Sequence, residues 1–251
     1  MRKSLVWAAL AATLSLTLAP AVATAPVASA QPGSTSIALP QVPAEALAKP
    51  GSAKANEAGH VHHDVPRVAP GQERADFNAW LARAPENRAA VRAFRTHLAA
   101  NGVDDVVPIW QLVRTSSSWR ECAAGRFEVA PRDKWDNIVT TLKFIERDVE
   151  PVVGDVQAVS GYRNAQLNSC SNGAPASAHR HFFALDLMPV DEDVTRGELV
   201  RKVCAAHARD GRVHKTGLGF YTGTRFHLDS NGFRKWGPNG SGATSPCVTS
   251  A

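Results

Sequence analysis

Beyond residue 73, apolar residues first recur every three or four positions, which is the spacing of one helical face. The pattern predicts helices that begin at Asp76, acting as an N-cap, at Pro85 and at Pro131, and Asn101-Gly102 ends the second of them. The apolar positions that define these helices are Phe77, Trp80 and Leu81; Val91, Phe94 and Leu98; and Trp135, Ile138, Leu142 and Ile145.

The later part of the chain carries short apolar runs that are typical of strands. Strands are predicted over 155–160, 182–188, 217–221 and 225–229, a helix over 194–208, and an extended segment over 106–113. Because helices gather early and strands late, the expected class is α+β, with N-terminal helices packed on a small, mostly antiparallel sheet.

The N-terminal stretch has the pattern of a secretory signal peptide over 1–30. Met1-Arg2-Lys3 is a basic start, an apolar run follows, and Ala28-Ser29-Ala30 offers a cleavage site. An uncleaved membrane anchor is the alternative, which the short apolar run disfavours. Residues 31–72 are rich in Pro and Ala, as in a linker or pro-region, and 73–251 form the expected folded domain.

Charge excludes some partners. Lys+Arg 28 against Asp+Glu 23 gives a net charge of +5, and without Arg2 and Lys3 of the signal segment it is +3. Nucleic-acid binders carry a clustered basic stripe, so no nucleic acid partner is expected. A mild positive charge suits an anionic polymer such as a bacterial wall. We therefore expect a secreted or periplasmic protein, without stable membrane insertion after signal cleavage, and a monomer.

Four cysteines agree with an oxidising compartment. Cys122, Cys170, Cys204 and Cys247 allow three pairings, and they contain no C-x-x-C of the kind that binds zinc. The pairing we favour is Cys122–Cys170 with Cys204–Cys247, because the second bridge would pin the Ser/Gly-rich C-terminal tail to the domain.

One carboxylate stands inside an apolar strand. Asp186 lies in the run Phe182–Met188, and burying its charge is costly unless it is paired with a cation. An arginine is one candidate partner, and Arg163 and Arg180 are near in sequence. A metal ion is the other candidate.

Two histidines are candidates for the same site. His179 lies seven residues before the carboxylate, so it is expected in the loop before the strand, folding back towards it. His227 shares one strand face with Asp229, while Phe226 and Leu228 take the core face. Each histidine alone has an ordinary structural interpretation.

Taken together, the motifs resemble a known family. They are Ser160-Gly161-Tyr162-Arg163-Asn164, Leu167-Asn168, Ser177-x-His179, Ala184-x-Asp186, Gly217-x-Gly219-Phe220-Tyr221, Phe226-His227-Leu228-Asp229 and Trp236. In this order they resemble the M15 zinc peptidases, which are D-Ala-D-Ala carboxypeptidases and murein endopeptidases with a fold shared by the hedgehog N-terminal domain. The resemblance covers residues 155–237.

The resemblance implies that His179, Asp186 and His227 hold one Zn²⁺ on the sheet, with a fourth position open for water. Arg163 would grip a substrate carboxylate or the developing oxyanion. Ser177 and Tyr221 would support substrate binding. The implied activity is hydrolysis of peptidoglycan stem peptides by an exported zinc peptidase, either a D,D-carboxypeptidase or an endopeptidase.

The chain departs from the family pattern at three positions. Phe182 stands where glycine is usual, and we expect its ring to narrow the approach to the metal. Thr224 stands where many members carry a catalytic Glu, and Arg225 where others carry a His. The nearest substitutes for a general base are Asp229 and His181. Asp229 has a second interpretation, as a carboxylate that orients His227, and His181 as a solvent-facing loop histidine.

These departures keep a second function open. A zinc-containing module that binds wall peptides without hydrolysing them would retain the three ligands and lose the base. A third possibility, a structural domain held by disulfides and an Asp186–Arg163 ion pair, would bind no metal.

Overall fold

The structure is a computed structural model that describes residues 67–249. The predicted signal peptide over 1–30 and residues 31–66 of the predicted linker lie outside the described residues. None of the helices within 67–249 combines the length and the apolar character that a membrane crossing requires.

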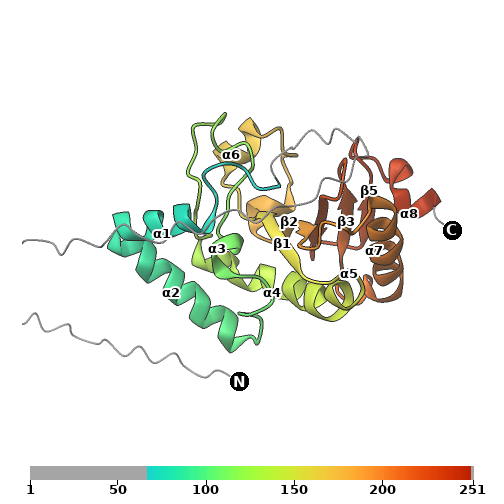
Figure 1. Cartoon of the computed structure of the whole chain (residues 1–251), viewed down its shortest axis with the longest axis horizontal. Helices are drawn as coiled ribbons and strands as arrows, with labels where there is room; N and C mark the ends of the chain where they lie inside the picture. Colours follow the sequence, from blue (N-terminus) through green and yellow to red (C-terminus); the bar gives the residue numbers. More distant parts are fainter. Residues whose placement is uncertain (1–66, 250–251) are drawn as a thin grey trace, which may run out of the picture. The chain divides into compact units, whose positions relative to one another are not determined.

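The elements follow the α+β order expected from the sequence (Figure 1). The α-helices are α1 (Arg74–Arg83), α2 (Pro85–Ala100), α3 (Ile109–Leu112), α4 (Trp135–Phe144), α5 (Glu150–Val153), α6 (Ala165–Cys170), α7 (Arg196–Asp210) and α8 (Pro246–Thr249). The strands are β1 (Val156–Ser160), β2 (Ala184–Pro189), β3 (Gly217–Phe220), β4 (Phe226–Asp229) and β5 (Arg234–Trp236). Shorter 3₁₀ turns are η1 (Arg132–Lys134), η3 (Ala178–His181) and η4 (Gly242–Thr244), and a π-helical turn, η2 (Ile145–Val149), joins α4 to α5.

The predicted apolar faces of the second and third helices are buried, and in the first helix Phe77 is buried while Trp80 and Leu81 are partly buried against the core. Phe77, Val91, Phe94 and Leu98 belong to the core, as do the apolar residues of α4. One detail of the first helix differs. Asp76 is the third helical residue, and it forms a capping box with the N-cap residue Glu73.

The expectation of an extended segment over 106–113 is wrong. Residues 109–112 form α3, a single helical turn whose N-cap is Pro108. Val107, Leu112 and Val113 are buried, and a short apolar run of this kind has no period that separates a buried helical turn from a strand. β5 was not predicted, because Arg234-Lys235-Trp236 has no apolar run.

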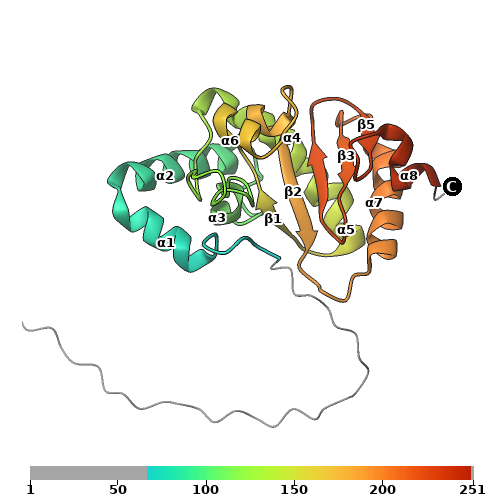
Figure 2. The same ribbon diagram turned by 90° about the horizontal axis from the view of Figure 1, so that it is seen from above.

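The sheet has the strand order β1-β2-β4-β3-β5. Neighbours are antiparallel except β3 and β5, so the expectation of a mostly antiparallel sheet is confirmed. Figures 1 and 2 place α1 and α2 beyond the β1 end of the sheet and α7 and α8 beyond the β5 end.

The two faces of the sheet differ in chemistry. Leu185, Leu187, Phe226 and Leu228 are fully buried members of the core, and α4 contacts the two strands that carry them. Since successive strand residues point to opposite faces, the residues between them point away from this apolar layer. The sheet therefore presents one polar face, and it carries Asp186, His227 and Asp229.

Both predicted disulfides are present. Cys122 pairs with Cys170 and Cys204 pairs with Cys247, which confirms the favoured pairing. The first bridge ties the loop after α3 to the end of α6, and the second ties the C-terminal tail to α7. Two disulfides indicate a non-cytoplasmic environment.

Candidate metal centre

The polar face of the sheet brings the three predicted ligands together. Asp186 of β2 and His227 of β4 are direct partners in the antiparallel register. His179 comes from η3, the turn immediately before β2, so the prediction that it folds back from the preceding loop is confirmed. All three side chains are buried, and together they form a group that could hold a metal ion.

The spacing of the three candidate ligand atoms fits a small metal ion. His179 Nε2 lies 3.2 Å from His227 Nδ1 and 3.3 Å from Asp186 Oδ1, and His227 Nδ1 lies 3.1 Å from Asp186 Oδ1. In a tetrahedral site with metal–ligand bonds of about 2.0–2.1 Å, neighbouring ligand atoms are about 3.3 Å apart. Two imidazole nitrogens and one carboxylate oxygen also suit a divalent transition metal.

In each imidazole, the ring nitrogen that faces away from the other candidate ligands already has a hydrogen-bond partner. His179 Nδ1 lies 2.7 Å from the carbonyl oxygen of Gly161, and His227 Nε2 lies 2.8 Å from Asp229 Oδ2. Each acceptor selects the tautomer that carries its proton on that outer nitrogen. The lone pairs of His179 Nε2 and His227 Nδ1 then point towards each other and towards a carboxylate, an arrangement that requires a proton or a metal ion.

The two histidines differ in their affinity for that proton. Burial, together with the charge of Arg163, lowers the pKa of His179 to about 4. Burial also opposes the charged form of His227, but hydrogen bonds to Asp186 and Asp229 outweigh it and raise the pKa of His227 above its ordinary value. His179 is therefore the more readily deprotonated of the two, and His227 keeps a proton to higher pH than an ordinary imidazole does.

The two oxygens of Asp186 have different partners. Oδ2 accepts hydrogen bonds from Arg163 Nη2 at 2.6 Å and from Arg225 Nη2 at 2.7 Å. Oδ1 faces the two histidines and accepts a hydrogen bond from the Tyr221 hydroxyl at 2.9 Å. Burial alone would raise the pKa of this carboxyl, but the charges of Arg225 and Arg163 hold it well below its usual range.

Arg163 is buried and bonded on two sides. Besides Asp186, its Nε and Nη2 donate to Ser160 Oγ at 3.1 and 3.0 Å, and that hydroxyl donates to the carbonyl of Thr115. Of the two arginines proposed from the sequence, Arg163 therefore pairs with Asp186. Arg180 does not, since its guanidinium donates to the carbonyl of Pro175.

Asp229 lies on the far side of His227 from the candidate ligand atom. It contacts Nε2, whereas Nδ1 faces the other ligands, and Arg234 donates to both Asp229 oxygens at 2.7 and 2.9 Å. This geometry favours a carboxylate that orients His227 over one that accepts a proton from metal-bound water. Opposing charges also lower the pKa of Asp229 despite its burial.

The glycines of the Gly217-x-Gly219 motif make room for this polar face. A Cβ at Gly219 would collide with the ring of Trp236, and one at Gly217 would collide with the Asp229 carboxylate. Trp236 packs against both His227 and Tyr221, with ring centroids 5.3 Å apart in each case. The motif therefore lets β3 pass closely beside the site.

The remaining predicted residues lie on the turn before β2 and on the loop between β3 and β4. Ser177 is half-buried at the start of η3, where its amide donates to the carbonyl of Ala174. His181 is exposed, in agreement with the solvent-facing interpretation. Thr224 is half-buried.

Phe182 does not narrow the approach to the metal as we expected. Its ring is buried in the core, 5.7 Å from the ring of Phe94 and 6.2 Å from that of Tyr162. Its backbone has φ +58°, in the left-handed region that glycine adopts without strain. The backbone therefore makes a left-handed turn at Phe182 while its side chain fills the core.

The site also includes Ser160, Arg225 and Arg234, for which no role was predicted from the sequence. Alternation along β4 was the signal for Arg225, because residues 225, 227 and 229 share one face of a strand. Arg234 lies on β5, which the sequence did not predict, so its contact with Asp229 had no local signal.

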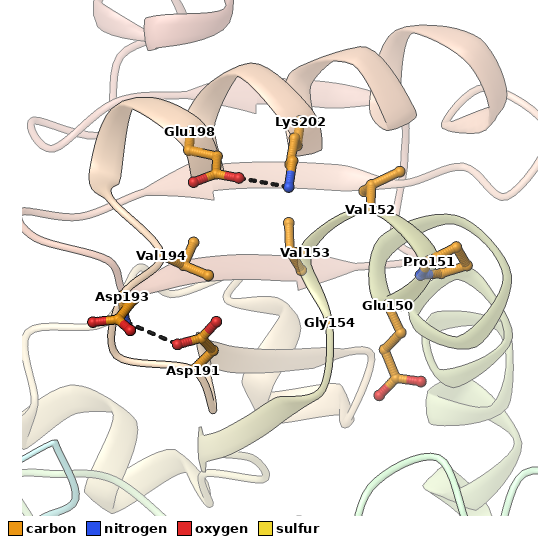
Figure 3. Close-up of a pocket in the computed structure, with 10 residues that line it drawn as sticks. All are labelled: Glu150, Pro151, Val152, Val153, Gly154, Asp191, Asp193, Val194, Glu198 and Lys202. Atoms are coloured by element: carbon orange, nitrogen blue, oxygen red, sulfur yellow. Dashed lines mark hydrogen bonds and ion pairs between the residues drawn. The ribbon is translucent and has the colours of Figure 1, made fainter.

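A separate hollow lies between α5, α7 and the loop after β2 (Figure 3). It has a volume of about 450 Å³ and includes none of the predicted site residues. Its charged side chains are partly satisfied among themselves. Glu198 pairs with Lys202 at 2.6 Å, and Asp191 accepts a hydrogen bond from the amide of Asp193. We therefore place the candidate site at the histidines.

Comparison of the chain with models of protein families, with curated proteins and with solved structures finds no match. The function is therefore argued from the residues of the site.

Proposed function

We propose that the chain is an exported zinc metallopeptidase that hydrolyses peptide bonds of peptidoglycan stem peptides, as a D,D-carboxypeptidase or a murein endopeptidase. The observation that carries the proposal is the convergence of His179 Nε2, Asp186 Oδ1 and His227 Nδ1 at mutual distances of 3.1–3.3 Å. Three ligands of this kind leave a fourth position open, which is the arrangement of catalytic rather than structural zinc. The two disulfides and the signal-like N-terminus support export.

Bound zinc would supply a Lewis acid for the scissile carbonyl and lower the pKa of bound water to about 7. The protein's own groups would orient the substrate. The guanidinium of Arg163 lies beside the ligands and suits a peptide carboxylate or an oxyanion. The hydroxyl of Tyr221, 2.9 Å from Asp186 Oδ1, is a second donor at the same place, and Ser177 lies at the start of the turn that carries His179.

One observation favours the rival function, a zinc-containing module that binds wall peptides without hydrolysis. Among the described residues that form this site, Asp186 is a candidate ligand, and Asp229 is bonded to His227 and Arg234. Arg225 occupies the position of a catalytic histidine in some relatives, and it is bonded to Asp186. No carboxylate in this described group is therefore free to act as a general base.

The metal is tested first. His179→Ala and His227→Ala should each lose about one equivalent of zinc, because removal of one of three ligands disrupts such a site. His181→Ala is the matched control, since this neighbouring histidine is exposed, and it should keep its zinc. Full zinc occupancy in both ligand variants would show that the ligands are misassigned.

Catalysis is tested on the natural polymer. Purified sacculi are incubated with the zinc-loaded protein, and the released fragments are identified by mass. Loss of a terminal D-Ala indicates a carboxypeptidase, and separation of cross-linked stems indicates an endopeptidase. If the protein binds to sacculi but releases no fragments, the enzyme proposal is wrong and the protein is a binding module.

A further inference from the structure

Arg225 occupies a position in the site that the proposed peptidase activity does not yet explain. It directly precedes β4 and shares the strand face of His227 and Asp229. Its Nη2 donates to Asp186 Oδ2 at 2.7 Å, and its side chain is about one quarter exposed, at 27%. The same oxygen already accepts a hydrogen bond from Arg163.

Residues other than the three candidate ligands also hold Arg225 in place. Its Nη1 donates to Ser117 Oγ at 3.0 Å, and its guanidinium carbon lies 5.1 Å from the centre of the Tyr221 ring. Ser117 belongs to the loop after α3, which the Cys122–Cys170 disulfide ties to the end of α6. Beside that bridge, the hydroxyl of Ser116 in this loop is bonded to that of Ser171, directly after α6, at 3.1 Å. The guanidinium therefore cannot leave Asp186 without breaking contacts on two other sides.

The effect of these contacts on Asp186 is to separate the roles of its two oxygens. A carboxylate can bind a metal through one oxygen or through both. With Oδ2 held by two guanidinium groups, only Oδ1 faces His179 Nε2 and His227 Nδ1. A carboxylate that bound through both oxygens would occupy part of the space that water or substrate needs.

We propose that Arg225 is a positioning residue that keeps Asp186 in a one-oxygen binding mode and so keeps the fourth metal position open. The inference rests on the proposed metal site, though not on hydrolysis, because a binding module would need the same open position. Arg163 alone is not sufficient for this role, since its guanidinium is shared with Ser160 and lies 3.3 Å from His179 Nε2.

The test uses the full chain loaded with Co²⁺, whose visible absorption weakens as coordination rises from four to five. Arg225→Met removes both hydrogen bonds and the charge. We expect it to bind one cobalt, to absorb at least about twofold less, and to bind azide at the metal about tenfold more weakly. Arg225→Lys should restore most of both signals, because an ammonium group can still donate to Oδ2.

The matched control is Arg180→Met. Arg180 is bonded to a backbone carbonyl and has no contact with Asp186, so this variant should keep the parental spectrum and azide affinity. If Arg225→Met does not fold, as judged by its thermal transition, Arg225→Gln is measured in its place.

The outcomes separate the inference from the metal site on which it rests. A parental protein that takes up no cobalt would overturn the metal site itself. Parental cobalt uptake, with the same spectrum and azide affinity in Arg225→Met or Arg225→Gln, would overturn the role of Arg225 and leave the metal site standing.

Discussion

His227 contacts a different carboxylate with each of its ring nitrogens. Nδ1 lies 3.1 Å from Asp186 Oδ1, and Nε2 lies 2.8 Å from Asp229 Oδ2. The three candidate ligands were predicted from the resemblance of the motifs to a zinc peptidase family, and the structure brings them together. The choice of ring nitrogen could not be predicted, because it depends on Asp229 and on its partner Arg234 from a strand that the sequence did not predict.

This geometry sharpens the prediction for Asp229→Asn. An amide cannot hold the Nε2 proton as a carboxylate does, so the imidazole loses its preferred tautomer. We expect zinc affinity to fall about 10–100-fold, while the kcat of the fully loaded enzyme stays near the parental value. Arg234→Met should show a smaller fall in affinity, because it loosens Asp229 without removing it. Undiminished zinc affinity with a kcat loss of about 10²–10⁴-fold would instead make Asp229 the general base.

The raised pKa of His227 predicts how metal binding depends on pH. Below that pKa the metal has to displace the proton on Nδ1, so affinity should fall about tenfold for each unit of decreasing pH. His179, with a pKa of about 4, is already neutral between about pH 5 and about 6.5, so one proton rather than two should be released there. Calorimetric titration in two buffers of different ionisation enthalpy counts the protons. Affinity that does not change across this range would contradict the prediction.

Helices and strands were predicted correctly where apolar residues repeat at a regular spacing over enough positions to be recognised. α2, α7 and strands β1 to β4 lie within about two residues of their predicted ranges. The helix predicted to begin at Pro131 instead starts with the 3₁₀ turn η1, and α4 begins at Trp135. The predictions for residues 106–113 and for β5 were wrong for opposite reasons. Residues 106–113 are apolar but show no period that identifies a helix or a strand. β5 has no apolar pattern and forms a strand only through its pairing with β3.

At Phe182, the backbone conformation favours glycine, whereas the core needs a large apolar side chain. Phe182→Gly relieves the left-handed φ of +58°, by about 1–2 kcal/mol, but it empties a fully buried site at a cost of about 3–5 kcal/mol. We expect a net loss of about 1–4 kcal/mol in the free energy of unfolding, measured by urea denaturation.

The matched control for Phe182 is Lys215→Gly. Lys215 has φ +51° and an exposed side chain, so glycine relieves the same backbone conformation and creates no cavity. The free energy of unfolding should rise by about 1–2 kcal/mol, which is the relief assigned to the same conformation in Phe182→Gly. A Phe182→Gly variant as stable as the parent would show that the ring does not contribute to the core.

Over the whole molecule, the two disulfides close loops of similar length at different distances from the site. Their sequence separations are 48 and 43 residues, for which the loss of chain entropy predicts about 4 kcal/mol of stabilisation each. The favoured one of the three pairings open from the sequence is confirmed. The contact between the first bridged loop and the metal centre could not be predicted from the sequence, because it runs through the side chains of Ser117 and Arg225.

The paired variants therefore serve as controls for each other. Cys122→Ser/Cys170→Ser and Cys204→Ser/Cys247→Ser should lose similar amounts of unfolding free energy, about 2–5 kcal/mol, in urea. Only the first frees the loop that carries Ser117, and so only the first should weaken azide binding to the cobalt-loaded protein, in the same direction as Arg225→Met. Equal loss of azide affinity in both variants would mean that the site responds to overall stability rather than to this loop. An unchanged affinity in the first would show that Ser117 keeps Arg225 in place without the bridge.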